Sequence, residues 1–198
     1  MDPIETARIA TYHRRRAGRA PLKALGWRTA ESQRLRFEAL CRWGDLSGLE
    51  VLDLGCGHGD ILPYLNGRFS NISYLGVDLL PEFVEEANRR HGHLANARFV
   101  LNDFLTGVLP EVDVVIACGS LNYKTENVLH PLQAIERMWE LARRGVAFNV
   151  LDADVFEPDP FLQAHDRDEV FSFCRNLDPE ATLVTDYSPE DFTVLMRR

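Results

Sequence analysis

The sequence has no hydrophobic run long enough to cross a membrane. Its apolar stretches fall short of the roughly 18 consecutive residues that a membrane-spanning helix needs. The first residues, Met1 to Glu5, also lack the apolar core of a signal peptide. Internal repeats and low-complexity tracts are absent as well. With 198 residues, 45% of them hydrophobic and 26% charged, we expect one globular domain over residues 1–198, located in the cytoplasm.

Cysteines are few and widely spaced. The four of them stand at positions 41, 56, 118 and 174, and no two form a C-x-x-C pair. This spacing argues against a disulfide framework or a structural zinc site. No cluster of histidines and carboxylates suggests another metal either. We therefore expect reduced, mostly buried thiols and no metal cofactor.

Basic residues are scarce outside the N-terminal segment. Residues 1–28 hold seven Lys or Arg and two acids, a net charge of +5, whereas residues 29–198 hold 15 basic and 28 acidic groups, a net charge of −13. Affinity for a phosphate backbone comes mainly from Lys and Arg, so an acidic body makes nucleic acid an unlikely partner. The run Arg14-Arg15-Arg16 keeps a nucleic-acid partner as a minor alternative.

Three glycines at alternate positions follow a short apolar strand. Val51–Leu54 is the predicted strand, Gly55, Gly57 and Gly59 come next, and a helix is expected to begin at Asp60. Such a tight turn needs backbone angles that a side chain disfavours, and it lets the backbone approach a ligand closely. A strand, a glycine turn and a helix start together indicate a nucleotide site in a doubly wound sheet.

The spacing of these glycines differs from the G-x-G-x-x-G fingerprint of dinucleotide-binding proteins. The pattern here is Asp53-x-Gly55-x-Gly57-x-Gly59, which resembles motif I of the class I methyltransferases that use S-adenosylmethionine (SAM). This resemblance implies that the glycine turn, including the backbone of Cys56, passes under the methionine part of SAM. It also implies that Asp53 helps to hold the amino group. A tight turn without any ligand is the ordinary alternative.

A second acid supports the nucleotide site. Asp78 ends the predicted strand Ile72–Val77 and lies 23 residues after Gly55, near the spacing expected for an acid that binds ribose hydroxyls. A helix cap is the alternative role for Asp78. Pro81 suits the first turn of the helix that follows.

Two further strand ends complete the expected cofactor site. In the family that the sequence resembles, an acid and an apolar side chain after the third strand meet the adenine. The loop after the fourth strand, Val112–Cys118, should lie near the sulfonium and the acceptor because ligands sit at the carboxyl ends of such strands. The additional candidates for SAM binding are Leu79, Asn102, Asp103, Phe104, Cys118, Gly119 and Ser120.

The remaining pattern predicts a Rossmann-like α/β fold. We expect a mostly parallel seven-stranded sheet with an antiparallel last strand and helices on both faces. The further elements are helices over Ala30–Trp43, His130–Arg144 and Asp168–Asn176, strands over Arg98–Leu101, Val146–Leu151, Ala181–Tyr187 and Asp191–Met196, and a loop over Asp152–Asp166. No residues remain for the separate substrate domain that a dehydrogenase of this design needs.

The segment before the core has the character of a lid. Residues 1–28 resemble the N-terminal segments that fold over the SAM site in methyltransferases of this size, and residues 29–198 form the expected core. A solvated basic helix on an acidic surface is the alternative. In the first core helix, Gln33 lies on one stripe with Phe37 and Leu40, and Arg36 flanks that stripe. Either polar side chain is a candidate to reach SAM or the substrate.

The expected activity is methyl transfer from SAM, with S-adenosylhomocysteine as the product, to a small-molecule acceptor that the basic segment suggests is anionic. A base is needed only where the acceptor must lose a proton. The candidates are Tyr123, His130 and His165, each of which also has an ordinary structural role. Two alternatives remain: an RNA or protein methyltransferase, and a SAM-binding protein without catalysis. The oligomeric state is left open.

Overall fold

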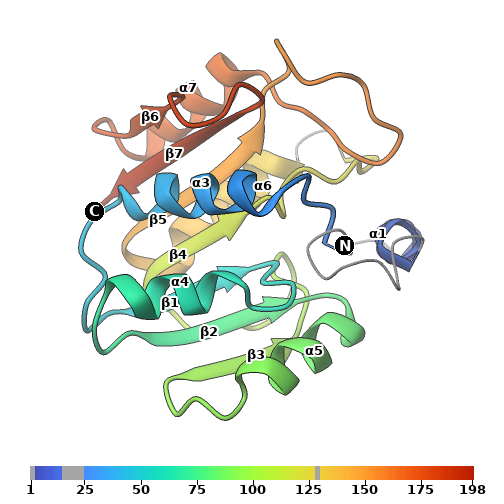
Figure 1. Ribbon diagram of the computed structural model, residues 1–198. Coiled ribbons are helices and arrows are strands. Elements are labelled where there is room, and N and C mark those ends of the chain that lie inside the picture. The colour runs from blue at the N-terminus through green and yellow to red at the C-terminus, as the bar shows by residue number, and fades with distance from the viewer. Residues whose placement is uncertain (1–2, 15–24, 128–129) are drawn as a thin grey trace.

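A seven-stranded sheet in the order β3-β2-β1-β4-β5-β7-β6 forms the centre of the computed structural model, which describes residues 3–14, 25–127 and 130–198 (Figure 1). The strands are β1 (Glu50–Leu54), β2 (Ser73–Asp78), β3 (Ala97–Leu101), β4 (Val112–Cys118), β5 (Ala142–Leu151), β6 (Thr182–Val184) and β7 (Asp191–Arg197). Strands β1 to β5 are parallel, and β7 runs antiparallel to both of its neighbours. The predicted Rossmann-like sheet is confirmed.

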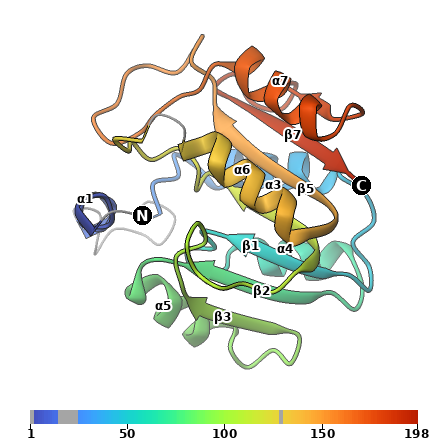
Figure 2. The same ribbon diagram turned by 180° about the vertical axis from the view of Figure 1, so that it is seen from behind.

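Helices cover both faces of this sheet. They are α1 (Pro3–Arg14), α3 (Ala30–Cys41), α4 (Ile61–Arg68), α5 (Pro81–His91), α6 (His130–Leu141) and α7 (Arg167–Leu177). Apolar residues of α3, α4 and α5 share one core cluster, and those of α6 and α7 share another on the opposite face (Figure 2). Helix α1 belongs to neither layer and lies beyond the carboxyl ends of the parallel strands (Figure 1).

Side chains alternate between the two faces of the sheet along the central strands, so each strand contributes to both hydrophobic cores. In β1, Val51 packs with α3 and α4, whereas Leu52 and Leu54 pack with α6. In β4, Val114 belongs to the core with α3 and α4, and Val115 belongs to the core with α6. All five side chains are fully buried, which is why both strands read as almost continuous apolar runs in the sequence.

The first core helix begins at Ala30, the residue that the sequence predicts. Thr29 is the N-cap, and its hydroxyl accepts a hydrogen bond from the backbone N–H of Ser32 at 3.0 Å. A hydroxyl in this place satisfies one of the backbone donors that a helix start leaves unpaired. Gln33, Phe37 and Leu40 are buried along one stripe of α3, so the predicted apolar face is correct.

The boundary between α6 and β5 differs from the prediction. The helix expected to reach Arg144 ends at Leu141, and β5 begins at Ala142 rather than at Val146. Arg143 and Arg144 are extended instead, because β5 pairs with β4 from Ala142 onward, where Ala142 lies opposite Val112. Strand β6 is also shorter than the predicted Ala181–Tyr187.

The N-terminal segment is described in two pieces. Helix α1 is one, and the chain from Leu25 onward is the other. The arginines at positions 15, 16 and 19 lie outside the described residues, so their expected role stays a prediction. Within the described ranges, every helix is too short or too polar to span a bilayer.

Candidate functional site

The glycine turn after β1 is held by the end of β2. The backbone N–H groups of Gly55 and Cys56 donate to the Val77 carbonyl at 2.8 and 3.0 Å. The N–H of Gly57 donates to Asp78 Oδ2 at 2.9 Å. The turn therefore takes its shape from the neighbouring strand, and Asp78 is part of that support.

Gly55 is required by both its conformation and its neighbours. Its φ of +75° lies in the left-handed region, which glycine adopts at little cost. A Cβ atom added here would lie 2.2 Å from the Ser120 Cβ. Ser120 in turn donates from its hydroxyl to the Leu54 carbonyl at 2.5 Å. The turn after β1 and the loop after β4 thus pack directly against each other.

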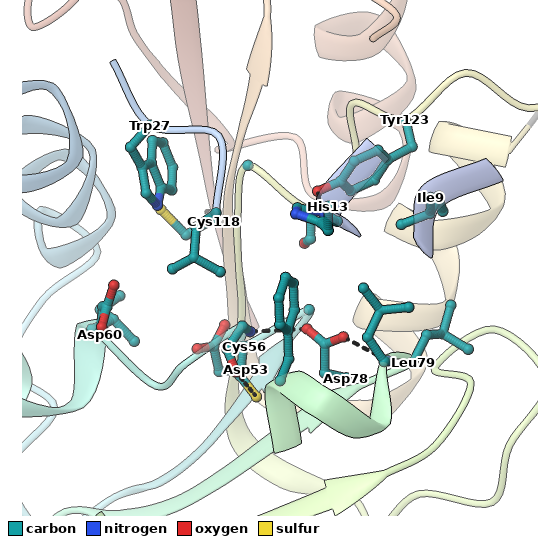
Figure 3. Close-up of a pocket in the computed structure, with 18 of the residues that line it drawn as sticks. Ile9, His13, Trp27, Asp53, Cys56, Asp60, Asp78, Leu79, Cys118 and Tyr123 are labelled. Carbon is teal, nitrogen blue, oxygen red and sulfur yellow. Dashed lines mark hydrogen bonds between the residues drawn. The ribbon is translucent and has the colours of Figure 1, made fainter. Parts of the chain in front are cut away.

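A cavity opens where these two loops meet. It lies at the carboxyl ends of β1 and β4, where the order of the parallel strands reverses, and ligands of doubly wound sheets bind at such a switch point. Among the sequence candidates, the residues that line it are Gln33, Asp53, Gly55, Cys56, Gly57, Asp78, Leu79, Phe104, Cys118, Gly119, Ser120 and Tyr123 (Figure 3).

The N-terminal segment covers this cavity. Ile9 and His13 of α1 and Leu25 and Trp27 of the following chain all line it. A Cβ at Gly57 would lie 2.9 Å from a methyl carbon of Leu25, so Leu25 lies directly on the glycine turn. The described part of residues 1–28 is therefore in the position that a lid requires.

Asp53 is buried at the floor of the cavity. Its side chain is at the end of β1, and its Oδ2 accepts a hydrogen bond from the Tyr74 hydroxyl at 2.6 Å. Oδ1 is buried and has no hydrogen-bond partner among the described residues. Burial raises the pKa of Asp53 to about 7, and the hydrogen bond from Tyr74 offsets part of that rise. A buried acceptor without a donor is well suited to a cationic ligand group.

Asp78 has two backbone partners. Oδ2 accepts from Gly57, and Oδ1 accepts from the N–H of Leu80 at 2.9 Å. Burial raises its pKa to about 6, and the hydrogen bonds from Leu80 and Gly57 lower it in part. Each carboxylate oxygen has a second lone pair, so these backbone contacts leave room for hydroxyl donors from a ligand. The alternative role as a cap is not seen, because the N-cap of α5 is Leu80.

The two polar candidates on α3 have different surroundings. Gln33 lines the cavity and donates to Asp60 Oδ2 at 3.1 Å. Arg36 does not line it, because its guanidinium forms a buried ion pair with Asp191 and lies 5.2 Å from the centroid of the Trp27 ring. Arg36 therefore supports the cavity wall through Trp27 instead of reaching into the cavity.

Five other candidates lie away from the cavity. Gly59 packs below α5, where an added Cβ would lie 2.7 Å from the Phe99 ring. Asn102 and Asp103 form hydrogen bonds within their own loop, to the Val108 carbonyl and from the Leu105 N–H. His130 is buried at the start of α6 beside a separate polar groove, and the His165 ring contacts the Leu121 carbonyl at 3.2 Å. We do not carry these five forward as ligand-binding groups.

Sequence reasoning missed two important side chains. Tyr74 lies on the adjacent strand β2 and donates a hydrogen bond from its hydroxyl to Asp53. A hydroxyl in an otherwise apolar strand is the sequence feature that could have indicated this partner. His13 lines the cavity, and its Nε2 lies 2.8 Å from the Tyr123 hydroxyl. These two residues are 110 positions apart, and no local pattern connects them.

Comparison with known proteins identifies the family. A family model described as "Methyltransferase domain" matches residues 52–148. The protein described as "Putative methyltransferase Rv1506c" from Mycobacterium tuberculosis is 33% identical over 158 residues, which cover 75% of this chain and 92% of that protein. The chain belongs to the class I SAM-dependent methyltransferases. A fatty-acid O-methyltransferase of Mycolicibacterium smegmatis is 39% identical, over only 34% of the enzyme described here and 24% of that protein.

The fold of this methyltransferase has solved counterparts. The N-methyltransferase NodS from Bradyrhizobium japonicum WM9, solved with S-adenosylhomocysteine, superimposes with a TM-score of 0.71 at 17% identity, over 95% of this chain and 97% of that one. SAM is the cofactor of the family. The residues present fit it, because the glycine turn lines the cavity and Asp53 offers a buried acceptor to an ammonium group.

The two buried carboxylates should make the cofactor-free enzyme lose stability as pH rises. Both folded-state pKa values, about 7 for Asp53 and about 6 for Asp78, lie above the ordinary 3.8. The folded state therefore binds more protons than the unfolded state between about pH 4 and pH 7. Burial lowers the pKa values of His58, His91 and His165, and these groups act in the opposite direction. We therefore expect the free energy of unfolding of the parent to fall relative to that of Asp53→Asn across this window in urea titrations. A difference between the two proteins that does not change with pH would contradict the assignment.

Asp53→Asn should separate stability from cofactor binding. Removing a buried charge should raise the melting temperature of the cofactor-free enzyme at pH 8, while SAM affinity falls by about 10-fold to 100-fold, the usual value of a hydrogen bond to a charged group. Calorimetric titration and thermal melting measure both quantities. Asp113→Asn, at the opposite end of the sheet, is the control and should leave SAM affinity unchanged. Unchanged SAM affinity in Asp53→Asn would remove the amino-group role.

Proposed function

We propose that this enzyme methylates a small-molecule acceptor whose body is mainly apolar. The observation that carries the proposal is the cavity itself, which α1 covers and which apolar side chains line on the side away from the glycine turn. Ile9, Leu80 and Phe83 form a small cluster there, with Leu25 and Tyr123 packed against it. A concave, partly covered apolar site favours a compact ligand over an extended macromolecular surface.

The described lining of the cavity supports a neutral acceptor. The anionic acceptor that the basic N-terminal segment suggests depends on residues 15–24, which lie outside the described residues. Among the described residues that line the cavity none is Lys or Arg, whereas Asp53, Asp60 and Asp78 are all present. The fatty-acid O-methyltransferase named above acts on an acid by its name, but the match to it covers too little of either chain to carry that acceptor over. The acidic body likewise gives no support to an RNA substrate.

The chain's own contribution to the reaction is alignment and exclusion of water. SAM carries its methyl group on a positively charged sulfur, so it supplies both the group to be transferred and a good leaving group. The glycine turn and Asp53 would hold the cofactor, and Asp78 would receive its ribose hydroxyls. Alignment of an acceptor behind the methyl group is worth roughly 7–11 kcal/mol in well-oriented reactions. The covering segment would exclude water from the aligned pair.

We further propose that the N-terminal segment acts as a lid on bound SAM. Trp27 lines the cavity, and a Cβ at Gly119 would lie 3.0 Å from its ring. Trp27→Ala should therefore weaken SAM affinity about tenfold, because it removes apolar cover equivalent to roughly 1.4 kcal/mol. Arg28→Ala is the control: Arg28 is exposed and pairs with Glu190, so its loss should not change the affinity. Equal SAM affinity in both variants and the parent enzyme would remove the lid role.

A methyl-transfer screen tests the acceptor class. The enzyme is incubated with methyl-labelled SAM and three kinds of acceptor: alkyl alcohols, phenols and acids; bulk RNA; and a mixture of unfolded proteins. We expect label in the small-molecule fraction. Label in RNA or protein alone would overturn the proposal, and SAM binding without any transfer would favour a non-catalytic role.

A further inference from the structure

His13 and Tyr123 meet inside the cavity. His13 belongs to α1 and Tyr123 to the loop after β4, and the distance between His13 Nε2 and the Tyr123 hydroxyl oxygen is 2.8 Å. Both residues line the cavity, and only 5% of His13 is exposed. In Figure 3 their side chains point toward one another, across the cavity from Asp53 and Asp78. The pair therefore faces the residues proposed to hold the cofactor.

Aromatic rings fix the orientation of His13. Its ring centroid lies 4.7 Å from that of Phe83 and 4.9 Å from that of Tyr12, both in edge-to-face geometry, and 5.7 Å from that of Tyr123. Such packing restricts rotation of the imidazole and keeps His13 Nε2 within hydrogen-bond distance of the Tyr123 hydroxyl. A neutral imidazole has one nitrogen without a proton, which can accept the hydrogen bond and then the proton of that phenol.

We propose that Tyr123 and His13 together accept the proton of an acceptor hydroxyl, either an alcohol or a phenol. This inference rests on the proposed function and names the chemical class of its acceptor. A carboxylic acid is already ionised at neutral pH and needs no base, whereas a hydroxyl keeps its proton and does. A Tyr–His pair in a cavity whose described lining has no Lys or Arg fits the second kind of acceptor.

The step balances without any further reactant. A lone pair of the acceptor oxygen forms the new O–CH₃ bond, and the bond between the methyl carbon and sulfur breaks with its electrons left on sulfur. The acceptor proton passes to the Tyr123 oxygen as the Tyr123 proton passes to His13 Nε2. His13 becomes an imidazolium, which returns its proton to water when the product leaves.

The two members of the pair have different roles. Tyr123 is the catalytic residue because its hydroxyl contacts the acceptor, and His13 acts through Tyr123 as a positioning residue that receives the proton. Since His13 is on α1, the pair is complete only when α1 covers the cavity. Proton transfer is thereby coupled to the presence of the lid.

Kinetics with two matched probes test the pair. The probes are 4-octylphenol and 4-octylbenzoate, which share a ring and an alkyl chain and differ in the acceptor group. In Tyr123→Phe and in His13→Gln, kcat for the phenol should fall about 100-fold while KM changes less than about threefold. Thr11→Ala is the matched control, since Thr11 is exposed on α1, does not line the cavity, and donates from its hydroxyl to the Ala7 carbonyl of its own helix. It should retain the parent's kcat.

A spectroscopic readout separates proton transfer from methyl transfer. With S-adenosylhomocysteine present, the absorbance of 4-octyl-2-nitrophenol reports how far the bound probe is ionised. The parent enzyme and Thr11→Ala should raise its ionisation constant about tenfold over that of the free probe, and Tyr123→Phe and His13→Gln should abolish that shift. A merely structural role for His13 would lower binding without removing the shift from the probe that remains bound.

The outcomes are distinguishable. Three results would overturn the proton-accepting pair while leaving the apolar acceptor in place. They are a kcat for the phenol in either variant that equals the parent's, an ionisation shift that neither variant alters, and methylation of the benzoate in preference to the phenol. Failure of the parent enzyme to bind any octyl probe would overturn the apolar acceptor and this inference with it.

Discussion

The site depends on the hydrogen bonds that join the glycine turn to the end of β2. The Val77 carbonyl and the Asp78 carboxylate accept three backbone N–H groups of the turn. These bonds fix the left-handed conformation of Gly55 and Gly57 and hold the turn below the cavity. The fold therefore places the backbone of the turn along the cavity because two neighbouring strands end side by side.

The same arrangement places negative charge where folding alone disfavours it. Asp53 and Asp78 are both buried, and burial raises both pKa values. A cofactor with a sulfonium and an ammonium group favours the ionised form that the empty site resists. The enzyme thus accepts a cost in its own stability near neutral pH, and cofactor binding offsets that cost. Tyr74, which donates to Asp53, limits the cost in the absence of ligand.

Local patterns predicted the parts of the molecule that local chemistry determines. Short-range spacing predicts the strand, glycine turn and helix from Val51 onward, the helix start at Ala30, and the acid Asp78 at the end of the second strand. Long-range pairing could not be predicted in this way. Arg36 forms its ion pair with Asp191, 155 positions away, and the predicted helix ends early because Ala142 pairs with Val112 of β4. The contact between His13 and Tyr123 exists only once α1 is placed over the sheet.

The most direct test of this account is a crystal structure of the enzyme with S-adenosylhomocysteine. We expect the amino group of the ligand within hydrogen-bond distance of Asp53 Oδ1, its ribose hydroxyls on Asp78, and Trp27 over the bound molecule. The Tyr123 hydroxyl should stay on His13 and face the ligand sulfur across a space sufficient for an acceptor. A ligand bound elsewhere, or one whose amino group avoids Asp53, would contradict the account.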